Sequence, residues 1–203
     1  MSGGDTSKPI DKGGKTVGKP AKPQIVYELT TPVFFVGFMG AGKTSVSRKL
    51  ARMCGLAAVD MDTYIERQEG KTVSDIFAEQ GESGFRTIET QVLRKLSKGT
   101  PMLVGCGGGV ITTPENREIL KERGYVVFLR VSAYEAKNRI SDLSTRPLFN
   151  QMEDAEKRNL ERLPFYLEVA DVEIDTAGKN VSTIAREVRR ELQRKGVLCA
   201  QQR

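Results

Sequence analysis

Histidine is absent from this chain of 203 residues. Its absence excludes histidine-based nucleophilic triads and histidine general bases, and it removes most zinc sites. Any acid–base chemistry must therefore depend on aspartate, glutamate, lysine or tyrosine.

Cysteine is scarce, and long apolar runs are missing. The three cysteines, Cys54, Cys106 and Cys199, show no C-x-x-C spacing, so we expect free thiols in a reducing compartment. No apolar run approaches the roughly 20 residues that cross a bilayer. The N-terminal segment also lacks the apolar core of a secretory signal. These absences predict a cytoplasmic protein that does not associate with a membrane.

The net charge is +6 and the pI is about 9.3. Residues 1–24 contain five lysines and two aspartates, so half of this charge, +3, lies there. The remainder is ordinary for a protein that handles phosphates and small anions. Basic residues are not interleaved with aromatic ones, and we therefore expect no nucleic-acid partner.

Two regions differ in composition. Residues 1–24 are rich in Gly, Lys, Pro, Ser and Thr, which predicts a disordered basic tail. A basic arm that contacts nucleic acid or membrane is the alternative. Residues 31–198 are expected to form a single domain, because 38% hydrophobic and 29% charged residues are ordinary for a globular chain of this length.

Short apolar runs alternate with amphipathic segments along this domain. Ser74 is expected to cap a short helix, which a break at 81–84 separates from the next, and Pro164 should interrupt or kink a later helix. The expected strands are 33–36, 56–59, 102–104, 125–131 and 172–174. The longer expected helices are 45–54, 64–69, 85–97, 114–122, 133–140, 155–168 and 181–195. The alternation predicts an α/β fold, a three-layer sandwich with a parallel sheet covered by helices on both faces.

Residues 37–44, G-F-M-G-A-G-K-T, match the phosphate-binding loop pattern G-x-x-x-x-G-K-[ST]. The loop follows an expected strand and precedes an expected helix, as the motif requires. Its backbone N–H groups and the helix N-terminus can bind phosphate oxygens. Lys43 can reach the β- and γ-phosphates, and the Thr44 hydroxyl can hold Mg²⁺. The alternative is a glycine-rich turn that matches by accident.

Two further expected strands end in unusual residues. Asp60 and Asp62 follow one strand, and the triplet Gly107, Gly108 and Gly109 follows another. In a parallel sheet these ends would face the same crevice as the phosphate loop. One aspartate could orient water on Mg²⁺ while the other accepts a hydrogen bond from a substrate hydroxyl. A helix cap with surface charge, and a flexible turn, are the alternative interpretations.

Arginines form the remaining candidates. Arg86 and Glu89 lie three residues apart on one helical face, where an ion pair could hold Arg86 for a substrate carboxylate. Arg139, Arg146 and Arg162 flank or lie in the segment 141–153, which lacks periodicity and suggests a lid that brings positive charge to a phosphoryl group. Surface arginines and a surface ion pair are the alternatives.

The motifs occur in a specific order: G-F-M-G-A-G-K-T, D-M-D, G-F-R-x-x-E, G-G-G-V, R-P-L and E-R-L-P-F-Y. In this combination, residues 32–194 resemble the shikimate kinases. The resemblance implies a five-stranded parallel sheet of the nucleoside monophosphate kinase type, a P-loop fold with a lid. It also implies ATP-dependent phosphorylation of the 3-hydroxyl of shikimate in aromatic amino acid biosynthesis, with Mg²⁺.

The resemblance implies a role for each matching residue. Lys43, Asp62 and Arg146 would be catalytic, and Thr44 would bind Mg²⁺ directly with Asp60 acting through water. The residues implied in ATP binding are Gly40, Ala41, Gly42, Lys43, Thr44, Ser45, Arg139 and Arg146. Those implied in shikimate binding are Asp62, Arg86, Gly107, Gly108, Gly109 and Arg162.

Two features depart from the family pattern: the lid lacks the expected glycines, and the N-terminal tail has no counterpart. Another small-molecule kinase of the same fold, such as a gluconate kinase or a nucleoside monophosphate kinase, is the first alternative function. A nucleotide-binding regulatory domain without turnover is the second. ATP and shikimate are the expected partners of a monomer.

Overall fold

The computed structural model describes residues 25–139 and 152–202. Its strands are β1 (Ile25–Leu29), β2 (Val33–Val36), β3 (Ala58–Asp60), β4 (Leu103–Gly105), β5 (Tyr125–Arg130), β6 (Val172–Asp175) and β7 (Leu198–Gln202). Its helices are α1 (Lys43–Cys54), α2 (Met61–Glu69), α3 (Val73–Lys98), the 3₁₀ helix η1 (Val110–Thr112), α4 (Pro114–Arg123), α5 (Ala133–Arg139), α6 (Met152–Val169) and α7 (Val181–Arg194).

Five strands form one parallel sheet in the order β3-β4-β2-β5-β6. The central strand β2 pairs with β4 through Val33 and Leu103, and with β5 through Val33 and Tyr125. From β2 the chain runs to β3 and β4 on one side of it and then crosses to β5 and β6 on the other, and this reversal opens a crevice at the carboxyl ends of the strands. The predicted α/β fold with a five-stranded parallel sheet is confirmed.

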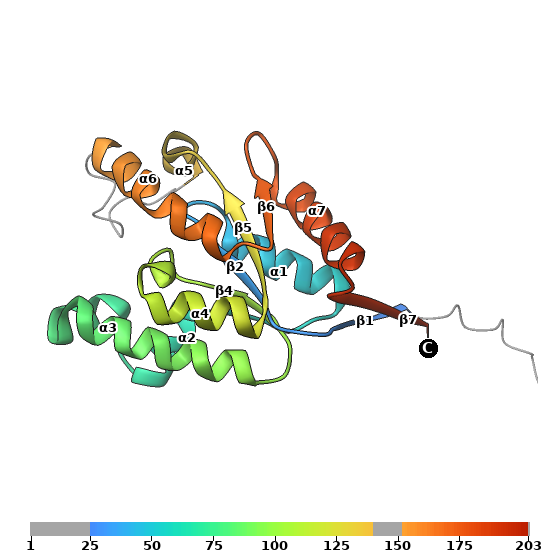
Figure 1. The fold of residues 1–203 in the computed structure, drawn as a ribbon, viewed down its shortest axis with the longest axis horizontal. Coiled ribbons are helices and arrows are strands. Elements are labelled where there is room, and N and C mark those ends of the chain that lie inside the picture. Colours follow the sequence, from blue (N-terminus) through green and yellow to red (C-terminus); the bar gives the residue numbers. More distant parts are fainter. Residues whose placement is uncertain (1–24, 140–151, 203) are drawn as a thin grey trace, which may run out of the picture.

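Helices cover both faces of this sheet, as Figure 1 shows. All four residues of β2 are buried, and they alternate between two apolar clusters. Val33 and Phe35 pack with residues of α1 and α7, whereas Phe34 and Val36 pack with residues of α3, α4 and α6. A central strand that is buried on both faces needs apolar residues at every position, which explains why β2 has the sequence V-F-F-V.

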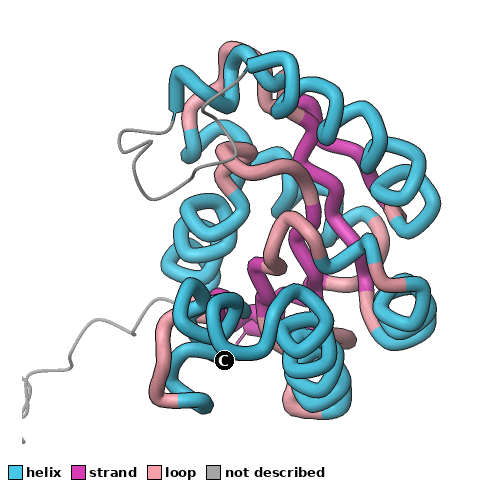
Figure 2. Tube along the Cα trace, turned by 90° about the vertical axis from the view of Figure 1, so that its left-hand side faces the viewer, coloured by secondary structure: helices cyan, strands magenta, loops and turns pink. Residues whose placement is uncertain are grey.

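A second sheet lies outside the predicted limits of the domain. Strands β1 and β7 pair in antiparallel fashion, from Ile25 opposite Gln202 to Leu29 opposite Leu198. This strand pair joins the two ends of the described chain beside the five-stranded sheet (Figures 1 and 2). The predicted limits, 31 and 198, leave out nearly all of it, because each strand finds its partner about 170 residues away.

One local prediction was wrong. Thr72, rather than Ser74, caps α3, because its side chain and that of Asp75 form a reciprocal capping box. The predicted break at 81–84 coincides with non-helical backbone at Gly81 (φ 68°, ψ −176°), where two helical segments meet at a kink within α3. Pro164 begins no new segment, because helix α6 continues through it; its ring lies on the exposed side of the helix, where water can reach the carbonyl group that loses its partner.

Among residues 25–139 and 152–202, no helix combines the length and the apolar character needed to span a membrane.

Candidate active site

A cleft of about 810 Å³ opens at the carboxyl ends of β2, β3 and β4. It is lined by the phosphate loop, the two aspartates at the junction of β3 and α2, part of the glycine triplet and the start of α7. The lining residues are Met39, Gly40, Ala41, Gly42, Lys43, Thr44, Ser45, Val46, Asp60, Asp62, Cys106, Gly107, Gly108, Arg139, Lys179, Asn180, Val181 and Ile184. The structure therefore brings together most of the residues that the sequence singled out.

The phosphate loop is held closely by neighbouring backbone. A side chain at Gly37 would place its Cβ 2.4 Å from the carbonyl oxygen of Leu129, and one at Gly40 would lie 2.7 Å from that of Ala136. Gly42 is the N-cap of α1 in the left-handed region, with a φ of 88°, and no side chain caps this end of the helix. The first N–H groups of α1 are thus available to an anion at the cleft.

Lys43 lies along the inner side of the loop. Its Nζ donates hydrogen bonds to the carbonyl oxygens of Gly37 at 2.8 Å and Phe38 at 3.0 Å. These contacts hold the ammonium group at the point where the loop faces the cleft. A short reorientation would bring it to a phosphate bound by the loop.

Asp60 joins the phosphate loop to α2. Its Oδ2 accepts a hydrogen bond from the Thr44 hydroxyl at 2.5 Å, and its Oδ1 accepts one from the backbone N–H of Thr63 at 3.1 Å, which caps α2. Within the described residues no group of three or more Cys, Asp and Glu side chains could hold a metal ion. The hydroxyl and one carboxylate fit Mg²⁺, which typically takes few protein ligands and completes its shell with water and substrate phosphates.

Asp62 lies in the first turn of α2 and lines the cleft opposite the glycine triplet. A Cβ at Gly107 would come within 2.9 Å of its Oδ1 and 3.2 Å of Oε1 of Glu89. The absence of a side chain at Gly107 therefore leaves room for the two carboxylates.

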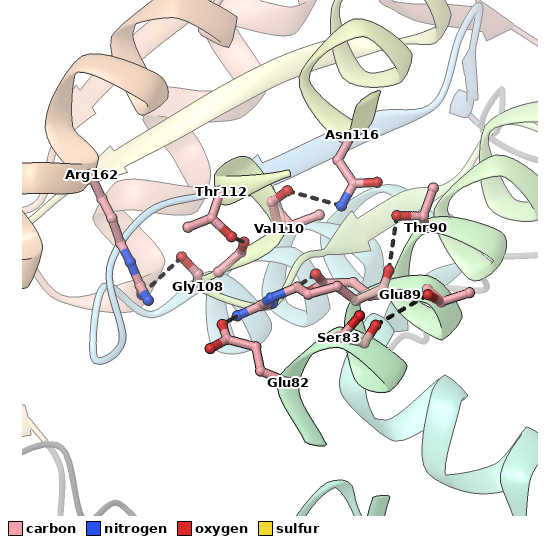
Figure 3. A network of polar contacts seen from close by, with 12 residues as sticks. Glu82, Ser83, Glu89, Thr90, Gly108, Val110, Thr112, Asn116 and Arg162 are labelled. Carbon is pink, nitrogen blue, oxygen red and sulfur yellow. Dashed lines mark hydrogen bonds and ion pairs between the residues drawn. The ribbon is translucent and has the colours of Figure 1, made fainter. Parts of the chain in front are cut away.

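Arg86 is held by two carboxylates of its own helix. Its guanidinium donates to Glu89 at 2.8 Å and to Glu82 at 3.1 Å (Figure 3). Only 1% of the Glu89 side chain is exposed. Burial raises the pKa of the Glu89 carboxyl above its ordinary value, and the charge of Arg86 opposes this shift. A Cβ at Gly109 would lie 2.4 Å from Nη2 of Arg86, so the guanidinium packs against this glycine.

Helix α6 reaches the glycine triplet from the other side. Arg162 and Tyr166 both donate hydrogen bonds to the carbonyl oxygen of Gly108, at 3.4 Å and 2.6 Å. Figure 3 shows Arg162 extended from its helix toward Gly108, across from Glu82 and Glu89. The two predicted arginines, Arg86 and Arg162, thus approach the same glycine triplet from α3 and α6.

Arg139 ends α5 and lines the cleft. It donates to the hydroxyl and to the carbonyl oxygen of Thr176, at 2.9 Å and 2.6 Å. The Thr176 hydroxyl in turn donates to the carbonyl oxygen of Arg130 at 2.8 Å. Arg146, the arginine predicted for the lid, and most of the lid at 141–153 lie outside the described residues.

Sequence reasoning missed several residues of this site. Tyr166 and Thr176 contact Gly108 and Arg139 through long-range hydrogen bonds. Tyr166 ends the motif E-R-L-P-F-Y but was assigned no role, and Thr176 lies in none of the motifs. Lys179 and Asn180 line the cleft, and only the N-cap position of Asn180 before α7 could have drawn attention to them. Cys106 also lines the cleft, but burial raises the pKa of its thiol well above the ordinary value, so it stays protonated.

Together, the sheet order, the loop and the two aspartates at the end of β3 define a P-loop phosphotransferase of the nucleoside monophosphate kinase type. A sequence model described as shikimate kinase matches residues 39–193. The chain is 41% identical over 165 residues to the shikimate kinase of Halorhodospira halophila, covering 79% of this chain and 93% of that protein. With the shikimate kinase of Dehalococcoides mccartyi it shares 37% over 158 residues, 77% of this chain and 90% of the relative.

Solved structures agree with the sequence comparison. The structure of the shikimate kinase from Acinetobacter baumannii in complex with shikimate superposes with a TM-score of 0.76 at 38% identity, over 81% of this chain and 94% of that one. A gluconokinase from Sinorhizobium meliloti, at 20% identity and a TM-score of 0.54, shares the fold alone. The chain belongs to the shikimate kinase family, as its motifs predicted.

Proposed function

We propose that this chain transfers the γ-phosphoryl group of ATP to the 3-hydroxyl of shikimate, giving shikimate 3-phosphate and ADP. One observation carries the proposal: an acceptor half built from Asp62, Arg86, Arg162 and the glycine triplet lies beside the phosphate loop at the same sheet edge. The family relatives named shikimate kinase, one of them solved with shikimate, support this choice of acceptor.

In the donor half, the phosphates of ATP would bind the N–H groups of residues 40–45, with Lys43 reaching the β- and γ-phosphates. Arg139, held by Thr176, would lie against the adenine. Thr44 would bind Mg²⁺ and Asp60 would hold one of its waters. When bound, the ion would neutralise charge on the phosphates.

In the acceptor half, Arg86 and Arg162 would bind the shikimate carboxylate. Glu89, on the far side of Arg86, keeps its guanidinium in place. Glycine at 107, 108 and 109 would let the substrate approach the backbone. Asp62 would accept a hydrogen bond from the acceptor hydroxyl and could take its proton during transfer. Because phosphoryl transfer depends mainly on position and charge neutralisation, histidine is not needed.

Several parts of the proposal rest on sequence reasoning alone. Arg146 would reach the transferring phosphoryl group from the lid. A monomer in the cytoplasm, with ATP and shikimate as its partners and without nucleic acid or membrane, remains the expectation from composition and motifs.

Release of ADP from MgATP, measured with and without shikimate, tests this function. We expect release that depends on shikimate and exceeds that with gluconate or nucleoside monophosphates. A preference for one of those acceptors would overturn the choice of substrate. ATP binding without release for any acceptor would favour a regulatory nucleotide-binding domain.

The variant Asp62→Asn tests the acceptor half separately. The amide keeps the shape of the side chain but cannot take a proton, so turnover should fall by about 10²–10⁴. The ATP dissociation constant should change less than about threefold, because the donor half is intact. Normal turnover of Asp62→Asn would remove Asp62 from the mechanism.

A further inference from the structure

The carbonyl oxygen of Gly108 accepts hydrogen bonds from two side chains that lie one turn apart on α6. Tyr166 donates from Oη at 2.6 Å, whereas Arg162 donates from Nη1 at 3.4 Å. The first distance is that of a strong hydrogen bond, and the second is at the outer limit of one. Arg162 is therefore the weaker and more easily displaced of the two donors.

Tyr166 is fixed in place by packing. Its side chain has no exposed surface, and its ring stacks on Phe128 of β5 with centroids 5.1 Å apart and planes inclined by 13°. Burial raises the pKa of its hydroxyl well above the ordinary value. The hydroxyl thus remains a neutral donor, and Tyr166 does not line the cleft.

Gly108 connects the two halves of the site. A Cβ at this position would lie 3.6 Å from the N atom of Met39 and 3.7 Å from the carbonyl oxygen of Gly37, both in the phosphate loop. The same residue lines the cleft together with that loop, and its carbonyl oxygen contacts α6. The orientation of its peptide groups therefore affects both the glycine triplet and the arginine that contacts it.

We propose that Tyr166 is a positioning residue that occupies the Gly108 carbonyl and so leaves Arg162 available to the carboxylate of the acceptor. This inference rests on the proposed function, in which Arg162 binds that carboxylate. When the acceptor enters, the guanidinium turns away from Gly108, and the carbonyl keeps its bond to Tyr166. Without the tyrosine hydroxyl, this turn would leave the half-buried carbonyl without a protein donor, which costs free energy. Arg162 would then stay on Gly108.

The variant Tyr166→Phe removes the hydroxyl and keeps the ring. We expect the shikimate dissociation constant and KM to rise about tenfold, while the ATP dissociation constant changes less than about twofold. Tyr125→Phe is the matched control, because the Tyr125 hydroxyl is buried and has no hydrogen-bond partner. This control should leave both dissociation constants unchanged. An unchanged shikimate affinity in Tyr166→Phe would overturn the inference.

Coupling to Arg162 separates positioning from a general structural effect. In an Arg162→Ala background, adding Tyr166→Phe should change the shikimate dissociation constant less than about twofold, since the arginine through which the tyrosine acts is gone. Shikimate methyl ester, which lacks the anionic charge, should lose less affinity than shikimate when Tyr166→Phe is introduced into the otherwise unchanged protein. Additive losses of shikimate affinity in the double variant would refute the coupling between Tyr166 and Arg162. Equal losses of affinity for shikimate and for its methyl ester would refute it as well.

The proposed function and the role of Tyr166 can be overturned separately. If the unsubstituted protein does not release ADP with shikimate, the proposed function fails. If it does, and Tyr166→Phe binds shikimate as the unsubstituted protein does, only the role of Tyr166 is refuted.

Discussion

Asp60 divides its two carboxylate oxygens between the phosphate loop and α2. Oδ2 accepts the hydroxyl hydrogen of Thr44 at 2.5 Å, and Oδ1 accepts the backbone N–H of Thr63 at 3.1 Å. One residue thus caps a helix and faces the predicted Mg²⁺ position. The two roles depend on different properties, since capping needs an oxygen acceptor and cation binding favours negative charge.

The variant Asp60→Asn separates these roles. Asparagine caps helices about as well as aspartate, so the free energy of unfolding should change by less than about 1 kcal/mol. Loss of the charge should raise the Mg²⁺ concentration for half-maximal activity by about 10- to 100-fold. Titrating Mg²⁺ at fixed ATP, alongside denaturant unfolding, measures both quantities.

Asp75→Asn provides the control for Asp60→Asn, because Asp75 is the exposed capping-box residue of α3, outside the cleft. Its Mg²⁺ dependence should match that of the unsubstituted protein. If Asp60→Asn reaches half-maximal activity at the same Mg²⁺ concentration as the unsubstituted protein, Asp60 acts only as a helix cap.

Gly109 leaves room for Arg86. A methyl group there would lie 2.4 Å from Nη2 of Arg86, although the backbone angles at Gly109, φ −99° and ψ −1°, are open to alanine. Gly109→Ala should therefore fold and displace the guanidinium, raising the shikimate KM by about tenfold or more with little change for ATP. Steady-state kinetics with each substrate varied in turn measure the effect.

Gly99→Ala is the matched control for Gly109→Ala, because its new Cβ would have no neighbour closer than 3.7 Å. It should keep both KM values. If Gly109→Ala also keeps the shikimate KM, Arg86 does not bind the acceptor from this position.

The parts of the site predicted from sequence are those that local pattern or topology determines. The phosphate loop is a contiguous motif, and Asp60 and Asp62 approach it because parallel strands end at one edge of the sheet. Arg86 and Glu89 were paired by their helical spacing, which the structure confirms.

The residues that were missed are defined by contacts across the chain. Tyr166 bonds to a residue 58 positions away, and Arg139 bonds to Thr176 at a separation of 37. Strand β1 pairs with β7 across almost the whole described chain. Side chains of ordinary type acquire such roles only when the fold brings their partners together, so neither periodicity nor the position of Tyr166 in the motif E-R-L-P-F-Y names the partner of each side chain.

Glu89 should make stability depend on pH. Its pKa is raised above the ordinary 4.5, mainly by burial, so the folded state holds this proton more tightly than the unfolded chain does. The stability of the unsubstituted protein relative to Glu89→Gln should therefore be greatest below pH 4.5. It should fall as the pH rises from there through the pKa of the folded state. Urea unfolding of both proteins between pH 4 and 8 measures the difference.

A second background sharpens the Glu89 test. The negative charge of Asp62 also raises the pKa of Glu89, so the same comparison made in Asp62→Asn should show a weaker dependence on pH. Arginine stays protonated throughout this range, which keeps the contribution of Arg86 constant. A relative stability that rises with pH would contradict the sign of the shift.

Thr176 should affect nucleotide binding through Arg139. Its side chain is completely buried, and its hydroxyl accepts one of the two hydrogen bonds that Arg139 donates to this residue. Thr176→Val removes the hydroxyl and leaves the carbonyl contact. The carbonyl of Arg130 keeps its bond from the Thr176 backbone N–H. With Arg139 held less firmly at the cleft, the ATP dissociation constant should rise about three- to tenfold, and the shikimate constant should stay within about twofold. Equilibrium titration with each ligand measures both dissociation constants.

Thr113→Val is the control, because Thr113 does not line the cleft; it should change neither dissociation constant. An unchanged ATP affinity in Thr176→Val would mean that Arg139 does not need this anchor to contact the nucleotide.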